Sequence, residues 1–153
     1  MRAFMKKDYC RSILLPLVII TVGGLLTLAI CYLLYFGVYS LVETVFYPNK
    51  PTAVPAGIIR TSYTVALLAL YLVLLRTKLS DLFKAAIFIG PMTMLVITTI
   101  LVFYETKALA AAAIVAIALF CFFLLYRFKK TWIFYYAAAA SVLVAAIYAW
   151  PQA

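Results

Sequence analysis

An uncharged stretch of 31 residues, Ser12–Val42, constrains this chain more than any other feature. It contains no Asp, Glu, Lys or Arg, and it exceeds the about 20 apolar residues that cross a bilayer as a helix. At 1.5 Å per residue it would reach about 46 Å, well beyond a hydrocarbon core of about 30 Å. The stretch predicts a transmembrane helix that tilts, kinks or projects past the membrane, and Gly23 and Gly24 are the expected site of a bend.

Four further apolar segments follow the first one. The chain is 69% hydrophobic and 11% charged, whereas soluble domains have about 25% charged residues. We therefore predict an all-α integral membrane protein, a five-transmembrane-helix bundle that forms a single domain over residues 1–153. Prolines between the first two spans predict a stiff, extended outer loop at Pro48–Pro55. The expected spans are approximately 12–47, 56–76, 85–104, 108–126 and 131–150.

The basic residues predict how the bundle is oriented. Ten of the 13 Lys and Arg residues fall in the predicted inner segments 1–11, 76–84 and 127–130. The positive-inside rule then puts the N-terminus in the cytoplasm and the C-terminus outside, as in a bacterial cytoplasmic (inner) membrane protein. The expected counter-ions for the net charge of +9 are anionic lipid head groups on the cytoplasmic side, and nucleic acid is not an expected partner.

Missing residue types exclude several classes of site. The chain has no His and no carboxylate in the middle of a predicted span, so haem, His-metal and Ser-His chemistry and a proton relay are not expected. Its three cysteines form no CxxC pair, so neither a metal site nor any other cofactor is predicted. The chain also lacks the in-membrane Glu of the small multidrug transporters and the Trp- and Pro-rich motifs of the translocator proteins.

Arg60 is the most informative charged residue. The uncharged run Thr61–Leu75 reaches only about 23 Å, so the second span must begin before Arg60 and hold it at the outer boundary. A charge at this depth is usually paired, and Glu43 and Glu105 are expected at the same level. We predict an ion pair with Glu43, or with Glu105 across the bundle. The alternatives are a side chain that snorkels to the surface and one that binds a phosphate or carboxylate head group.

Tyrosines form a second candidate set. Tyr32, Tyr35 and Tyr63 are expected inside the membrane, where a phenol hydroxyl needs a hydrogen-bond partner. They either bond between helices or line an aromatic, amphipathic pocket for a lipid-like ligand. Tyr148, at the end of a span, is expected to anchor the helix at the membrane interface.

Gly90 and Pro91 interrupt the third predicted span. The proline ring removes one backbone hydrogen bond and frees the carbonyl of Ile87, with the Thr93 hydroxyl nearby. This predicts either a static kink or a hinge beside a cavity, as in the broken helices of transporters.

Small residues recur every four positions in the last two spans: Ala108, Ala112 and Ala116, then Ala137, Ser141, Ala145 and Ala149. Such stripes let helix backbones approach closely, and neighbouring spans usually pair. They predict that the fourth span packs against the fifth. The alternative is that the same faces form a homodimer or bind a partner membrane subunit.

These features favour a non-enzymatic helix bundle that binds or translocates a small amphipathic or lipid-like molecule, or that serves as a membrane subunit of a larger complex. No residue is assigned a catalytic role. The alternative is a lipid-modifying membrane enzyme that uses Arg60 with Glu43 or Glu105 at the outer surface. The candidate ligand-binding residues are Arg60, Glu43, Glu105, Tyr32, Tyr35, Tyr63 and Pro91.

Overall fold

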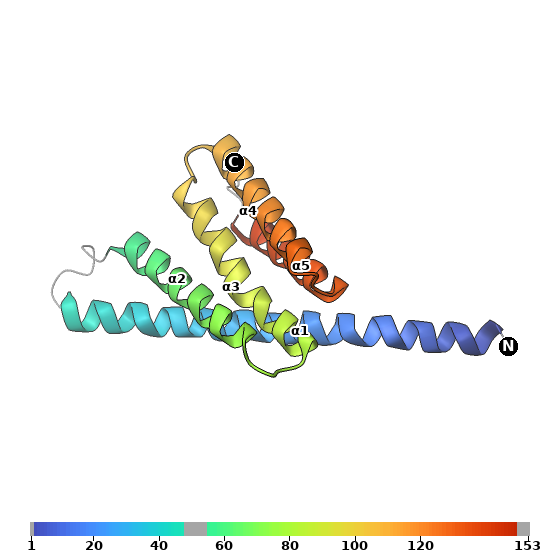
Figure 1. Cartoon of the computed structure of the whole chain (residues 1–153). Helices are drawn as coiled ribbons and strands as arrows, with labels where there is room; N and C mark the ends of the chain where they lie inside the picture. The colour runs from blue at the N-terminus through green and yellow to red at the C-terminus, as the bar shows by residue number, and fades with distance from the viewer. Residues whose placement is uncertain (1, 48–54, 150–153) are drawn as a thin grey trace.

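A computed structural model describes residues 2–47 and 55–149, with side chains for 13–47 and 55–149. The described part is helical, and all five of its helices are long and apolar enough to cross a membrane. The prediction of an all-helical chain with five helices of spanning length is therefore confirmed. The helices are α1 (Arg2–Phe46), α2 (Ala56–Leu75), α3 (Asp81–Val102), α4 (Lys107–Arg127) and α5 (Trp132–Ala149) (Figure 1). Residues 48–54 of the expected proline-rich loop lie outside the described residues.

Helix α3 is the centre of the bundle. It packs against each of the other four helices, whereas α1 crosses them obliquely and extends beyond them at its N-terminal end (Figure 1). Most residues of α3 are buried, and Val96 and Ile100 are completely inaccessible. The other helices expose large apolar side chains, such as Leu33 on α1 and Phe120 on α4. A helix that is apolar all round can therefore be either the core or the outer surface, depending only on its neighbours.

Glycines let α1 and α3 approach closely. A Cβ atom at Gly24 would lie 3.1 Å from Ile89 Cβ, and one at Gly90 would lie 2.9 Å from Cys31 Sγ. Helix α1 continues through Gly23 and Gly24 without a break, so the expected bend is not seen (Figure 1). The absence of a side chain serves close helix packing here instead of bending.

Pro91 also lies inside a continuous helix. Helix α3 runs from Asp81 to Val102 with Pro91 buried near its middle, so the proline does not end the helix, and the kink or hinge at this position stays a prediction. A proline removes one backbone hydrogen bond, and the bonds on either side are enough to continue the helix. Its neighbour Gly90 packs against Cys31 and Thr27 of α1.

Lys84 closes the C-terminal end of α2. Its Nζ donates hydrogen bonds to the carbonyl oxygens of Leu75, at 3.0 Å, and Thr77, at 2.7 Å, although the residue is only 7% exposed. Carbonyls at a helix C-terminus lack intrahelical partners and carry partial negative charge. The ammonium group of α3 therefore satisfies the last turn of α2 and fixes the connection between the two helices.

The small-residue stripe of α5 is buried, but mainly against α3. Ala137, Ser141 and Ala145 are completely inaccessible, and α5 makes its most extensive contacts with α3. The corresponding residues of α4 are all exposed: Ala108, Ala112 and Ala116. The prediction that α4 and α5 pack along both stripes is therefore wrong, because α4 turns Ala110 and Ile114 inward instead.

A leucine is expected to be tolerated on α4 and not on α5. Ala145→Leu should cost about 1–3 kcal/mol of stability, because the added atoms overpack a closed contact. Ala112→Leu adds the same atoms to an exposed face and should change stability by less than about 0.5 kcal/mol. Thermal unfolding of both variants in detergent measures the difference, and equal midpoints would show that the α5 face is not packed.

Candidate functional site

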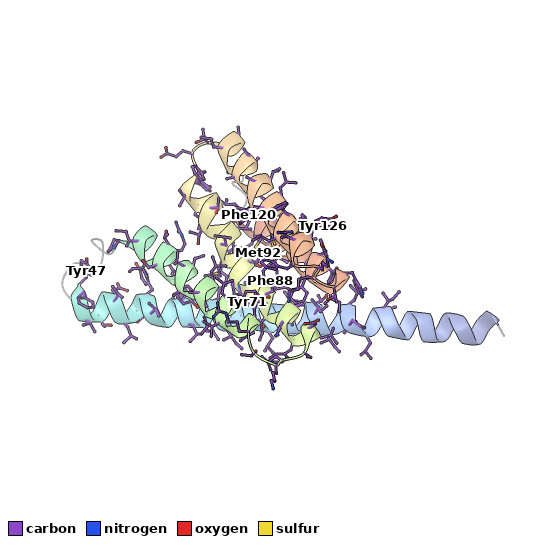
Figure 2. The ribbon with its side chains drawn as sticks, in the orientation of Figure 1. Tyr47, Tyr71, Phe88, Met92, Phe120 and Tyr126 are labelled. Carbon is purple, nitrogen blue, oxygen red and sulfur yellow. The ribbon has the colours of Figure 1, made fainter. Side chains whose placement is uncertain are left out.

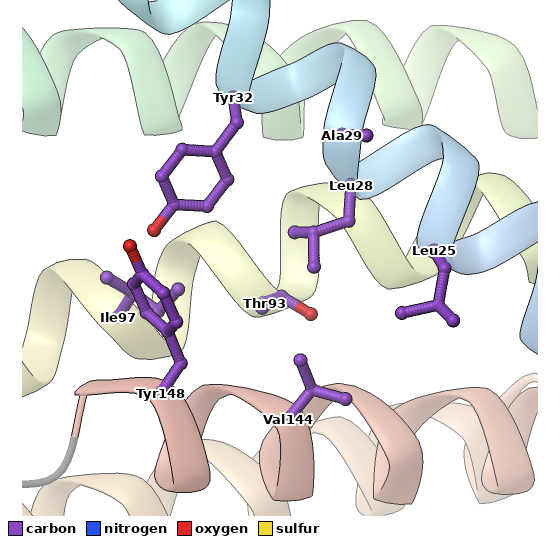
Figure 3. Close-up of a pocket in the computed structure, with 8 residues that line it drawn as sticks. All are labelled: Leu25, Leu28, Ala29, Tyr32, Thr93, Ile97, Val144 and Tyr148. Atoms are coloured by element: carbon purple, nitrogen blue, oxygen red, sulfur yellow. The ribbon is translucent and has the colours of Figure 1, made fainter.

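A cavity of about 310 Å³ lies between α1, α3 and α5, and we call it the Thr93 cavity. Its lining is apolar apart from three hydroxyl groups, and an apolar pocket with a few converging polar groups is the usual form of a ligand site. Figure 3 shows α1 along one side, α5 along the other and α3 between them. The lining residues are Leu25, Leu28, Ala29, Tyr32, Thr93, Ile97, Val144 and Tyr148.

Two contacts between α1 and α5 bracket this cavity. On one side the hydroxyl oxygens of Thr21 and Tyr136 are hydrogen-bonded at 2.9 Å. On the other side the rings of Tyr32 and Tyr148 meet edge to face, with centroids 5.8 Å apart. The hydroxyls of these two tyrosines point toward one another (Figure 3). The two helices thus touch before and after the cavity, and small or aliphatic residues separate them in between.

The Thr93 hydroxyl is the least satisfied polar group of the core. Thr93 is completely inaccessible, yet its Oγ1 has no hydrogen-bond partner among the described residues. The other buried polar side chains do have partners: Thr64, Lys84, Thr98 and Ser141. Leaving a buried hydroxyl unsatisfied costs about 1–3 kcal/mol, so a hydrogen-bond partner for this side chain would stabilise the fold.

Thr93 differs from its neighbours in where its hydroxyl points. Ser141 Oγ and Thr99 Oγ1 each donate to the carbonyl four residues earlier in the same helix, at 2.7 Å and 2.9 Å. Thr93 Oγ1 instead points into the space between Leu28 and Val144 (Figure 3). The hydroxyl thus faces the cavity without being exposed to it, and a molecule that parts the side chains around it could bond to it as donor, as acceptor or as both.

The predicted tyrosines separate into two places. Tyr32 lines the Thr93 cavity, whereas Tyr35 and Tyr63 pack against each other between α1 and α2, with centroids 5.6 Å apart. The Tyr63 hydroxyl donates to the carbonyl oxygen of Cys31 at 2.7 Å, so its hydrogen-bonding need is met within the protein. Tyr148, expected only as an interfacial anchor, is the second tyrosine of the cavity.

The predicted charged residues do not come together. Arg60 is half-buried in the first turns of α2, Glu43 is half-buried on α1, and Glu105 is exposed after α3. Arg60 Nε is buried with no hydrogen-bond partner, and no ion pair with either glutamate forms among the side chains that the structure describes. The backbone around Arg60 is tied to α3, since Thr64 Oγ1 donates to the Arg60 carbonyl at 2.9 Å and is hydrogen-bonded to Thr98 Oγ1 at 3.0 Å.

The lining of the Thr93 cavity supports binding more than catalysis. A hydroxyl becomes a nucleophile when a base removes its proton, and no carboxylate, lysine or cysteine lines this cavity. Within the described ranges, no group of three His, Cys, Asp or Glu side chains could hold a metal ion. No protein family, curated protein or solved structure matches this chain.

Proposed function

We propose that this protein binds a small, neutral amphipathic molecule in the Thr93 cavity. The observation that carries the proposal is the Thr93 hydroxyl, which is buried in an apolar cavity and lacks a partner in the described structure. A ligand with a hydroxyl or carbonyl group would satisfy it and recover the cost of leaving it unpaired. The rest of the lining would hold an apolar body.

The chemistry of the lining sets the class of ligand. No charged side chain lines the cavity, and burying an unpaired ion there would be costly, so the ligand carries no net charge. A second polar group of the ligand could reach the hydroxyls of Tyr32 and Tyr148, which lie on one side of the cavity. Long-chain alcohols and other neutral lipids with one or two oxygen atoms have this combination of groups.

Thr93→Val tests the proposal, because valine keeps the shape of threonine and lacks the hydroxyl. Without ligand the variant should unfold at the same or a higher temperature, since it removes an unsatisfied polar group. A long-chain alcohol that carries a diazirine should label the cavity of the wild type and label the variant about five- to ten-fold less, as expected for one lost hydrogen bond.

Thr99→Val is the matched control, because it makes the same chemical change on α3 at a hydroxyl that already has a partner. It should leave the labelling unchanged. Equal labelling of Thr93→Val and wild type would overturn the proposal. A clear loss of thermal stability in Thr93→Val alone would also contradict it, since that loss would mean that the hydroxyl is already satisfied.

We further propose that the bundle lies in a bacterial cytoplasmic membrane with its N-terminus in the cytoplasm and its C-terminus outside. The ten-to-three distribution of basic residues supports this orientation. Ligand binding in the Thr93 cavity is compatible with both proposed roles, a carrier of the ligand and a membrane subunit of a larger complex. The exposed Ala112 and Ala116 on α4 leave that face open to a second copy or a partner, while the α5 stripe is already used by α3.

The alternative of a lipid-modifying enzyme has less support. It requires Arg60 to act together with Glu43 or Glu105, and neither glutamate pairs with Arg60 in the described structure. The one observation in favour of this alternative is the buried Arg60 Nε without a partner in the described structure, since a guanidinium group can bind an anionic head group.

A further inference from the structure

A second cavity, of about 360 Å³, opens between α2 and α4, with α3 as its floor, and we call it the α2–α4 cavity. Tyr71, Phe88 and Met92 form buried parts of its wall. Leu72 and Phe120 stand on its rim and are each more than half exposed. Figure 2 shows the labelled Tyr71, Phe88, Met92 and Phe120 following one another between the two helices. The cavity is therefore open sideways, toward the surface where lipid chains would lie.

The length of the cavity matches one leaflet of a membrane. Along α4 it is lined from Ile117 to Phe128, which is about 16 Å of helix. Half of a hydrocarbon core of about 30 Å is about 15 Å. The cavity thus runs from one end of the bundle to roughly the middle of the span, as far as one extended acyl chain reaches within its leaflet.

Positive charge lies at the open end of the cavity. Lys130 lines it, with its Nζ over the Phe134 ring at 5.3 Å from the centroid. This end of the bundle also carries the other basic residues of the segments 76–84 and 127–130, against one acid, Asp81. A phosphate group at this level would meet a cation beside an apolar cavity, which is the arrangement of a phospholipid.

We infer that the α2–α4 cavity holds one acyl chain of an anionic glycerophospholipid, with the lipid phosphate beside Lys130. The contact is independent of the Thr93 cavity, which lies on the other side of α3 and is lined by α1 and α5. The two cavities suit different classes of ligand. The α2–α4 cavity ends at Lys130 and suits an anionic lipid, whereas the Thr93 cavity has no charged lining residue and suits a neutral molecule. The lipid would fill the gap between α2 and α4.

Lipid retention in native mass spectrometry tests the inference. The full-length protein, purified in mild detergent, is mixed with phosphatidylglycerol and with phosphatidylcholine of the same chains. Wild type should retain the anionic lipid in preference to the zwitterionic one. Lys130→Gln should lower that preference about five-fold, the effect of one lysine near a membrane surface. Lys78→Gln removes the same charge from an exposed residue that does not line the cavity, and should leave it unchanged.

A second pair of variants tests the acyl chain. Cys121→Phe fills the cavity from α4 and should lower retention of both lipids, whereas Val115→Phe places a ring at an exposed position on the same helix and should not. If Cys121→Phe fails to fold, phosphatidylglycerol with a diazirine at the chain end should cross-link wild type near Met92 or Leu95.

Three outcomes would overturn the inference. Equal retention of the two lipids by wild type would remove the role of charge, and equal effects of Lys130→Gln and Lys78→Gln would show only a general attraction to the basic end. Competition by inorganic phosphate without any effect of Cys121→Phe on lipid retention would indicate a free-phosphate site in place of a lipid site.

Discussion

A single methyl group at Gly24 is expected to destabilise the bundle by about 1–3 kcal/mol, the usual cost of overpacking a closed contact. The Cβ of Gly24→Ala would overlap the Cδ1 atom of Ile89 and would lie 3.1 Å from two further atoms of that side chain. Because Ile89 is buried in the core, it has little room to withdraw. Gly37→Ala is the matched control on the same helix, since a Cβ there meets nothing within 4 Å.

Unfolding in detergent should therefore separate the two α1 variants. Gly37→Ala should leave the midpoint unchanged or raise it slightly, because alanine favours a helix over glycine. Ile89→Val removes Cδ1, the atom nearest to the new methyl group, so Gly24→Ala combined with Ile89→Val should cost less than the sum of the single changes. Strict additivity would mean that α1 and α3 are not in contact at Gly24.

Lys84→Met is expected to cost about 3 kcal/mol or more. The change removes two hydrogen bonds from a charged donor, each worth about 1.5–3 kcal/mol, and leaves the carbonyls of Leu75 and Thr77 without that donor. Methionine has a similar length, so the loss reports on the ammonium group more than on volume. We expect Lys84→Met to lower the unfolding midpoint and to speed amide hydrogen exchange in the last turn of α2.

Lys78→Met provides the comparison for that experiment. Lys78 is exposed on the same connection, so its replacement removes an equal charge and should change stability by less than about 0.5 kcal/mol. A similar loss in both variants would show that the total positive charge, and not the contact with α2, is what stabilises this end of the bundle.

The number of helices could be predicted from the sequence, and their arrangement could not. An uncharged run of sufficient length predicts a helix that can span a membrane, whatever surrounds it. Inside a membrane, however, a helix is apolar on the face that packs and on the face that meets lipid, so periodicity does not show which face is which. For this reason the sequence does not distinguish α3 as the central helix, and the alanine stripe of α4, which is exposed, predicts a packed face.

The candidate site was predictable only in part. The sequence points to Tyr32, because a tyrosine deep in a span needs a hydrogen-bond partner. Thr93 and Tyr148 line the same cavity, but they lie on different helices. Their role in the site depends on how these helices pack, and the sequence does not show that. A clue was available at Thr93, since it follows Pro91 closely, but its sequence context gives no reason for the hydroxyl to point away from its own helix. Arg60 was placed correctly near the start of α2, while its expected carboxylate partner was not found in the described structure.

The close crossing of α1 over α3 has a mechanical consequence, because any tilt of α1 would pivot about it. The tightest contacts fall between Gly23 and Cys31, and the parts of α1 on either side, which include Leu15 and Phe46, are largely exposed. A rotation of about 10° about the crossing would move the Phe46 end by about 4–5 Å but Tyr32 by only about 1 Å, at 1.5 Å of helix per residue. In a membrane, a tilt of α1 about this crossing would therefore displace the ends of the helix several times more than its wall of the Thr93 cavity.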